Sequence, residues 1–218
     1  MNAEIPWGWY IVRASALIAF LLLYVSVFFG TVSCLPGIGR FFLRLRSLRF
    51  HCWISLQALI FVLIHSLSLL FDKVIPFGWP DVFIPFHSSY KPLFVALGTI
   101  SLYIMIILVV SSYARKYISQ KLWRTLHFLN IALYIFSIIH ALYLGTDLKN
   151  GALREIFIWA NGILILLLAY NMFYRIWSKV NQREVVCEIP TPKSYEDIRQ
   201  SDPAGGSQRG NQNFRRRI

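Results

Sequence analysis

Long uninterrupted runs of apolar residues fill the sequence up to about residue 177. Five of them, at about 9–33, 51–71, 92–113, 123–145 and 155–177, reach the ~20 residues that a helix needs to cross the hydrocarbon core of a bilayer. A helix satisfies its backbone hydrogen bonds internally and can therefore face lipid, which irregular backbone cannot. The pattern predicts an all-α membrane protein whose residues 1–178 form a bundle of five transmembrane helices.

The chain changes character after these runs. Residues 179–218 are rich in Pro, Gly, Ser, Gln and Asn, show no apolar period and end in a run of three arginines before the last residue. This composition is typical of a disordered segment. The basic end either adheres to anionic lipid or docks a partner protein, and the sequence leaves both readings open.

Basic residues are distributed unevenly among the loops. Four lie between the first two predicted spans, four lie between the third and fourth, and nine follow Tyr174, whereas the other two loops balance their bases with acids. Of the 22 Lys and Arg residues, 17 therefore fall on one side, which the positive-inside rule makes cytoplasmic. The sequence predicts an N-terminus outside, a C-terminus in the cytoplasm, and residence in a plasma membrane or bacterial inner membrane.

The composition agrees with a membrane protein. Of the 218 residues, 56% are hydrophobic and only 15% are charged, with a mean hydropathy of +0.54. A net charge of +12 would suggest a nucleic-acid ligand in a soluble chain, but here topology accounts for it, so we expect no nucleic-acid partner. No nucleotide-binding signature is present, so we expect this chain to bind neither FAD nor NAD(P)H.

Four of the five histidines lie in two of the predicted spans. His51 and His65 are in the second span and His127 and His140 in the fourth, and both helices run in the same direction. His51 and His127 each follow an arginine by two or three residues, whereas His65 and His140 each precede an aspartate by seven. Each helix therefore contributes one histidine at each of two depths. After this predicted topology we call His51–His127 the inner pair and His65–His140 the outer pair.

Two histidines at one depth are the ligand set of a six-coordinate haem. His51 and His65 are separated by 14 residues, which puts them about 21 Å apart along the helix and within roughly 40° of the same face. His127 and His140 are separated by 13 residues, which leaves them about 140° apart on an ideal helix. The spacing on that helix therefore requires a tilt, a kink or a haem that reaches from another angle.

Other uses of these histidines stay open at this point. They can be polar packing residues that bond across helices, or they can relay protons or ions in a transporter. A single shared metal ion is excluded, because ligands about 21 Å apart cannot reach one ion. No CxxCH motif is present, so covalent haem attachment is not expected.

Three segments carry a resemblance to a known family: GWYIVRASALIAFLLLYVSVFFG, RSLRFHCWISLQALIFVLIHSL and KLWRTLHFLNIALYIFSIIHALYLGTD. Over about residues 9–177 the chain resembles the ferric reductase-like transmembrane domain superfamily, which includes the NADPH oxidases, the ferric reductases and the bacterial MsrQ (YedZ) haem subunits. Its most specific element is the unequal histidine spacing of 14 and 13 residues, which the oxidase branch shares. The chain departs from the group in two ways: it lacks the fused FAD/NAD(P)H module, and it has five spans where MsrQ-type proteins usually have six.

The resemblance implies two non-covalent b-type haems, one on His51 and His127 and one on His65 and His140. It also implies that Arg13 lies beside the outer haem, where it binds the propionates, although an arginine at that position can instead extend to the surface. The expected function is electron transfer as an oxidoreductase subunit. Electrons come from a separate cytoplasmic-side flavoprotein, iron–sulfur protein or quinol and leave to an outside acceptor, either a ferric chelate, oxygen or an extracytoplasmic reductase partner.

Two alternatives from other classes remain. One is a proton- or ion-translocating protein, and the other is a haem-bearing subunit that assembles a partner enzyme. In the loop after the second span, His87 either lines an acceptor site or is an ordinary loop histidine. Three aromatic residues fall between the two histidine levels and could fill that space: Phe61, Tyr134 and Phe136.

Overall fold

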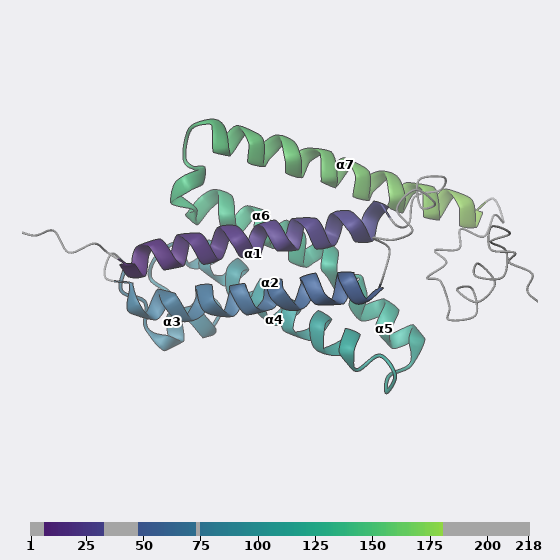
Figure 1. Cartoon of the computed structure of the whole chain (residues 1–218), viewed down its shortest axis with the longest axis horizontal. Coiled ribbons are helices and arrows are strands. Elements are labelled where there is room, and N and C mark those ends of the chain that lie inside the picture. Colours follow the sequence, from purple (N-terminus) through teal and green to yellow (C-terminus); the bar gives the residue numbers. More distant parts are fainter. Residues whose placement is uncertain (1–6, 33–47, 73–74, 181–218) are drawn as a thin grey trace, which may run out of the picture. The chain divides into compact units, whose positions relative to one another are not determined.

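The computed structural model describes residues 7–32, 48–72 and 75–180, and within these it contains helices and loops but no strand. Its five long apolar segments confirm the predicted multi-pass helical architecture (Figure 1). Four of them are α1 (Trp7–Val32), α2 (Leu48–Ser68), α4 (Pro92–Tyr113) and α7 (Ala152–Val180). The fifth is divided into α5 (Gln120–His127) and α6 (Leu129–Leu144). The tail predicted for residues 179–218 lies almost wholly outside the described residues.

Short elements complete the connections. The 3-10 helix η1 (Leu69–Phe71) extends α2, and η2 (Thr146–Leu148) follows α6. The short helix α3 (Trp79–Phe83) is fastened to the side of α4, because the hydroxyl of Thr99 donates to the carbonyl of Val82 (2.8 Å) and that of Tyr103 donates to the carbonyl of Phe83 (2.5 Å). The loop between the second and third spans therefore lies along α4.

Several helices begin earlier than the apolar runs predict. The hydrophobic pattern marks the part that lipid surrounds, whereas the helix continues into polar residues where a cap is available. At α5 the side chain of Ser119 accepts a hydrogen bond from the backbone N–H of Leu122 (3.2 Å), which starts the helix at Gln120 rather than at residue 123. At α4 Pro92 occupies the first turn, where its missing N–H costs no hydrogen bond.

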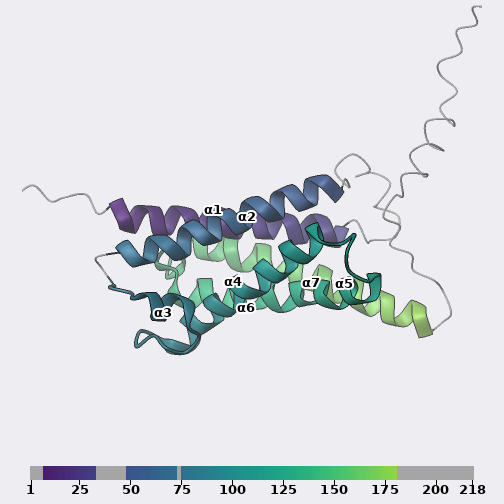
Figure 2. The same ribbon diagram turned by 90° about the horizontal axis from the view of Figure 1, so that it is seen from below.

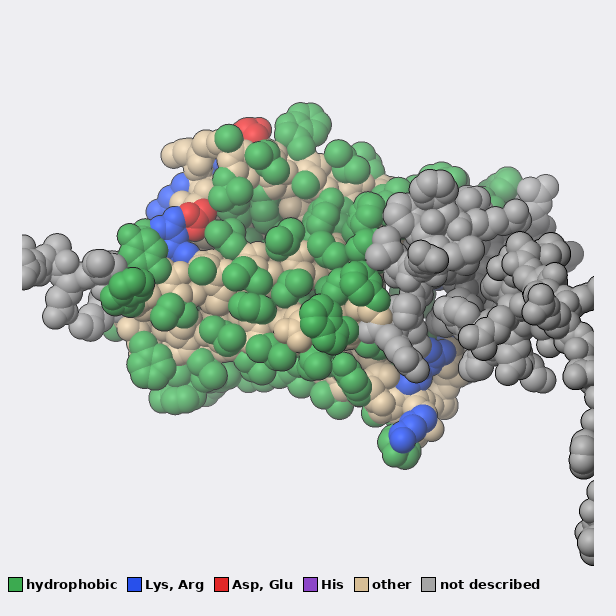
Figure 3. Space-filling model, viewed as in Figure 1, with side chains coloured by type: hydrophobic (Ala, Val, Ile, Leu, Met, Phe, Trp, Pro, Cys, Tyr) green, Lys and Arg blue, Asp and Glu red, His purple; other side chains and the backbone are tan. Residues whose placement is uncertain are grey.

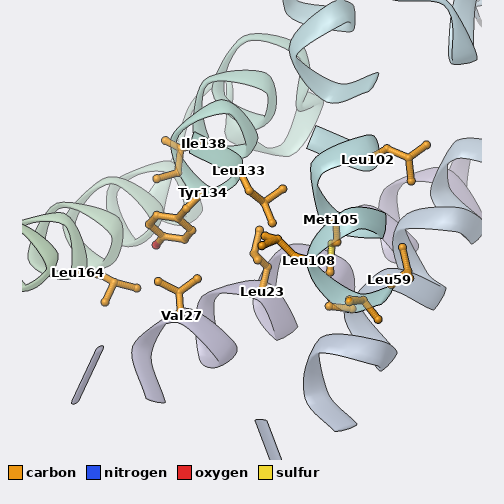
Figure 4. Packing of buried hydrophobic residues seen from close by; sticks show 12 residues of the cluster. Leu23, Val27, Leu59, Leu102, Met105, Leu108, Leu133, Tyr134, Ile138 and Leu164 are labelled. Atoms are coloured by element: carbon orange, nitrogen blue, oxygen red, sulfur yellow. The ribbon is translucent and has the colours of Figure 1, made fainter. Parts of the chain in front are cut away.

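The helices pack in two close pairs. Figures 1 and 2 show α1 beside α2 and α4 beside α6, and α2 also contacts α4, which joins the pairs. α7 makes fewer contacts, mainly with α1 and η2. Leucine, methionine and tyrosine side chains from these helices meet in a dry core, in which Leu23, Met105 and Leu133 lie close together (Figure 4).

The exterior of the long helices is apolar. Figure 3 shows hydrophobic side chains over the middle of the visible face, with Lys and Arg toward its two ends. Large side chains such as Leu21 on α1 and Leu166 on α7 are 60% and 71% exposed. A water-soluble monomer rarely exposes so large a continuous apolar surface, whereas a bilayer covers it favourably.

Candidate functional site

The inner pair joins the beginning of α2 to the end of α5. The rings of His51 and His127 have their centres 6.3 Å apart, with 68° between their planes. Both residues are partly buried. The structure therefore brings together the two histidines that the sequence predicts at this level.

The outer pair joins α2 to α6 at the other level. The ring centres of His65 and His140 are 6.4 Å apart, with 83° between their planes. The two pairs are thus nearly equal in separation, although they lie 14 residues apart on one helix and 13 on the other.

The fourth span has a break between its two histidines. α5 ends at His127, Phe128 forms a turn, and α6 begins at Leu129. The backbone N–H of Phe128 lies 3.2 Å from the carbonyls of both Arg124 and Thr125. The hydrogen bonding at this point is therefore intermediate between that of an α-helix and that of a 3-10 helix. A kink there is one of the ways in which the sequence allows both histidines of this span to reach the same helix, α2.

Each ring except one is held through its Nδ1 atom. Nδ1 of His65 donates to the carbonyl of Val12 (3.1 Å), and Nδ1 of His140 donates to the carbonyl of Phe94 (2.8 Å). Nδ1 of His51 lies 3.3 Å from the hydroxyl of Ser26. The two carbonyl contacts leave Nε2 of His65 and His140 as the nitrogen with a free lone pair, which is the arrangement that orients histidine ligands in metal proteins, and the hydroxyl of Ser26 suits the same tautomer of His51 when it accepts from Nδ1.

The ring separations fit one metal ion between each pair. An imidazole nitrogen ligates a metal at about 2.0–2.1 Å and the ring centre lies about 1.1 Å behind it, so two rings on opposite sides of one ion have centres about 6.2–6.4 Å apart. The 6.3 and 6.4 Å separations of the two pairs fall in that range. Haem needs only two protein ligands for each iron, because the porphyrin supplies the other four nitrogens. Among the described residues no group of three or more His, Cys, Asp or Glu gathers as a conventional metal site.

A glycine lies against the outer pair. A Cβ added at Gly98 of α4 would be 2.5 Å from Nδ1 and 3.1 Å from Nε2 of His140, closer than side chains normally approach. At the inner pair a Cβ on Gly30 of α1 would be at an ordinary 3.8 Å from the His51 ring. The ring of His140 therefore occupies space that only a glycine at position 98 leaves open.

An apolar layer separates the two pairs. Ala58 lies midway between His51 and His65 on α2 and is fully buried, and Leu133 lies at the corresponding level of α6 with 4% exposure. Tyr134 is also fully buried, and its hydroxyl donates to the side-chain oxygen of Asn161 (2.5 Å). Of the aromatic residues predicted for this region, Tyr134 lies in the core, while Phe61 and Phe136 are partly exposed.

Arg13 lies next to the outer pair through its neighbour Val12. Its guanidinium forms a two-pronged ion pair with Asp147, in which Nε is 2.8 Å from Oδ2, and it lies 3.9 Å above the ring of Trp9. The ion pair connects the beginning of α1 to η2. The binding of haem propionates by Arg13 stays a prediction.

His87 forms a separate contact in the loop next to α3. Its Nδ1 lies 3.0 Å from the carboxylate of Asp81, and its side chain is 53% exposed. The hydrogen bond from His87 and a second one from the backbone N–H of Gly78 lower the pKa of Asp81. Asp81 also caps α3, so this contact orders the loop.

Sequence reasoning found the histidines but not the groups that hold them. The carbonyls of Val12 and Phe94 carry no side-chain signal, and Ser26 is one of several serines within apolar runs. Gly98 was equally inconspicuous among the glycines of the chain. The sequence indicates Asp147 as a marker of the outer level and as one of the acids in its loop, but not as the partner of Arg13.

A family model described as a domain of unknown function (DUF8596) matches residues 8–147, well over half of the chain. The chain belongs to this family. The matched region includes all four paired histidines together with Arg13 and Asp147, and it ends before α7. No curated protein and no solved structure matches the chain.

Proposed function

We propose that the chain is a transmembrane b-type cytochrome that holds two haems and passes electrons across the membrane. The observation that carries the proposal is the pair of matched histidine contacts, each at the ring separation that suits one ion, at two levels of a bundle with five membrane-length helices. The resemblance of residues 9–177 to the ferric reductase-like superfamily supports the same reading.

The chain's own residues would supply ligands, orientation and burial. Nε2 of each paired histidine would bind iron, while Val12, Phe94 and Ser26 hold the opposite side of three of the rings. Gly98 leaves room for the ring of His140. Haem supplies one-electron transfer when it is bound, and the protein tunes it through ligand identity, hydrogen bonding and burial.

The direction of transfer follows from the charge of the loops. With the basic loops in the cytoplasm, the inner pair lies on the donor side and the outer pair on the acceptor side. We propose a separate flavoprotein, iron–sulfur protein or quinol as donor. A ferric chelate, oxygen or an extracytoplasmic reductase is the proposed acceptor.

The apolar layer between the pairs favours electron transfer over proton transfer. A proton relay needs a chain of polar side chains or water, whereas Ala58, Met105 and Leu133 are 0%, 3% and 4% exposed at the level between the histidines. Electrons cross such a layer without polar carriers. The hydrogen bond between Tyr134 and Asn161 at the same level leads to α7, where Asn161 donates to the carbonyl of Phe157, rather than to a histidine. The apolar residues therefore support a cytochrome over a proton-translocating protein.

Vesicles test the proposal directly. Purified protein is placed in liposomes that contain ferricyanide, and dithionite is added outside. We expect protein-dependent bleaching of the trapped ferricyanide, and we expect His65→Ala to stop it while one haem is retained. If the chain holds two haems but the bleaching equals that of protein-free vesicles, transmembrane conduction is wrong and an assembly role gains support. If the chain holds no haem, the cytochrome proposal itself is wrong.

A further inference from the structure

Three side chains form a stacked column beside the inner pair. The ring of Trp123 lies 4.9 Å from that of His127 at 19° between planes, so the two rings are nearly parallel. The guanidinium of Arg115 also lies over the Trp123 ring, 4.4 Å from its centre, and is the third member of the column. Arg115 follows the end of α4 and Trp123 belongs to α5, so the column joins two helices.

Two ring nitrogens of the column are buried without a hydrogen-bond partner in the part of the chain that the structure describes. Nε1 of Trp123 and Nδ1 of His127 are both buried, and neither has a hydrogen-bond partner among the described residues. The other three paired histidines each have a partner at Nδ1. Buried donors are nearly always satisfied in folded proteins, because leaving one without an acceptor costs its lost hydration.

Arg115 also has a charge to satisfy. Among the described residues its guanidinium makes a long 3.4 Å hydrogen bond to the neutral side chain of Gln120 and no ion pair. The connection from residue 114 to 122 contains no acid. Arg115 is partly buried, whereas the neighbouring Lys116 is exposed. Among the described residues the site therefore combines a cation and an unpartnered indole N–H without an anion, which suits a carboxylate ligand because a carboxylate only accepts hydrogen bonds.

We propose that Arg115 and Trp123 bind a propionate carboxylate of the porphyrin held by the inner pair. This inference rests on the proposed function and assigns two further residues to the inner site. Arg115 supplies charge and N–H donors, and Trp123 supplies its Nε1–H. Trp123 also positions His127 by stacking, in place of the Nδ1 hydrogen bond that holds the other rings.

The test compares redox potentials of variants that leave the iron ligands intact. Arg115→Gln removes the cation, and Trp123→Phe removes the N–H while keeping an aromatic ring. An uncompensated propionate charge stabilises ferric over ferrous haem, so we expect one of the two midpoint potentials to fall. For Arg115→Gln we expect at least a tenfold shift of that haem toward the oxidised form, which is 59 mV for one electron. For Trp123→Phe we expect about a threefold shift, and faster transfer of one haem to apomyoglobin in both variants.

Matched controls are available on the same chain. Lys116→Gln removes the adjacent positive charge, which lies 4.7 Å from the Tyr117 ring, and Trp159→Phe alters an exposed indole on α7. We expect both to keep the parent potentials. We expect Arg115→Lys to keep a midpoint potential close to that of the parent protein, because lysine retains the positive charge.

Esterified haem identifies the source of the carboxylate. Apoprotein is reconstituted with iron protoporphyrin IX or with its dimethyl ester, whose propionates carry no charge. We expect Arg115→Gln to speed haem transfer with the free acid but not with the ester. An equal acceleration with the ester would mean that Arg115 acts on another anion, such as a lipid headgroup, and would overturn the inference. Unchanged potentials and haem-transfer rates in a protein that holds two haems would also overturn it, while leaving the proposed function standing. A parent protein without haem would instead refute the proposed function.

Discussion

Replacing Gly98 by alanine tests the outer site through a single added methyl group. The new Cβ would lie 2.5 Å from Nδ1 of His140 and closer still to its Cε1, whereas an ordinary contact begins at 3.4 Å, so the ring has to retreat by about 1 Å. The helix backbone of α4 is fixed by its own hydrogen bonds and does not yield easily. The retreat breaks the 2.8 Å hydrogen bond between His140 and the carbonyl of Phe94.

The cost can be estimated from these contacts. Overpacking costs about 1–3 kcal/mol and the lost hydrogen bond about 1 kcal/mol, which together weaken the outer site by about 2–4 kcal/mol, or roughly 30- to 800-fold. A metal–ligand distance tolerates only about 0.2 Å of change, so His140 cannot keep its bond to iron after such a movement. We therefore expect the Gly98→Ala protein to hold one haem per chain when haem is limiting.

The assay is a haem determination per chain combined with a redox titration. Gly30→Ala and Gly162→Ala are matched controls, because a Cβ at the first lies at an ordinary 3.8 Å from the inner pair and at the second meets nothing within 4 Å. Alanine also favours a helix over glycine by about 0.5–1 kcal/mol, so these controls should not lose stability. A Gly98→Ala protein with two haems and parent potentials would refute the reasoning.

Three further outcomes are expected. Ser26→Ala removes the hydroxyl beside the inner pair and should weaken that haem site about 10- to 100-fold while sparing the outer one, as haem transfer to apomyoglobin would measure. Arg13→Gln leaves the partly buried Asp147 without its partner and should lower the free energy of unfolding by about 1–2 kcal/mol, so an unchanged melting temperature in detergent would argue against the ion pair. The pKa of Asp81 is lowered by its histidine partner and a backbone N–H, so the folded loop binds fewer protons than the unfolded one; its contribution is present above about pH 4 and is lost as the pH falls through the lowered pKa. Trp79 fluorescence should report this acid transition, and Asp81→Asn should abolish it.

Hydrophobic pattern was sufficient to predict the membrane helices, because twenty apolar residues in a row have few other stable environments. It located the start of α4 at residue 92 but not that of α5, since the N-cap at Ser119 lies in polar sequence beyond the apolar run. It also missed α3, whose attachment to α4 depends on hydroxyls that meet carbonyls only in the folded chain.

The candidate site divides in a similar way. The levels of the four histidines follow from counting along two parallel helices, and the structure brings the same residues together. The 13-residue spacing of His127 and His140 allows for a kink in the fourth span, but it does not indicate that a turn lies at Phe128. The backbone carbonyls that hold the outer rings belong to residues whose side chains are apolar, so no sequence pattern identifies them.

The central claim is that each histidine pair ligates one haem, and low-temperature electron paramagnetic resonance of the oxidised, purified protein tests it most directly. With haem quantified per chain, we expect two low-spin bis-histidine signals. One signal should be lost in both His51→Ala and His127→Ala, and the other in both His65→Ala and His140→Ala. Absence of any haem absorption after expression with added haem would contradict the account, and so would loss of the same signal in variants of different pairs.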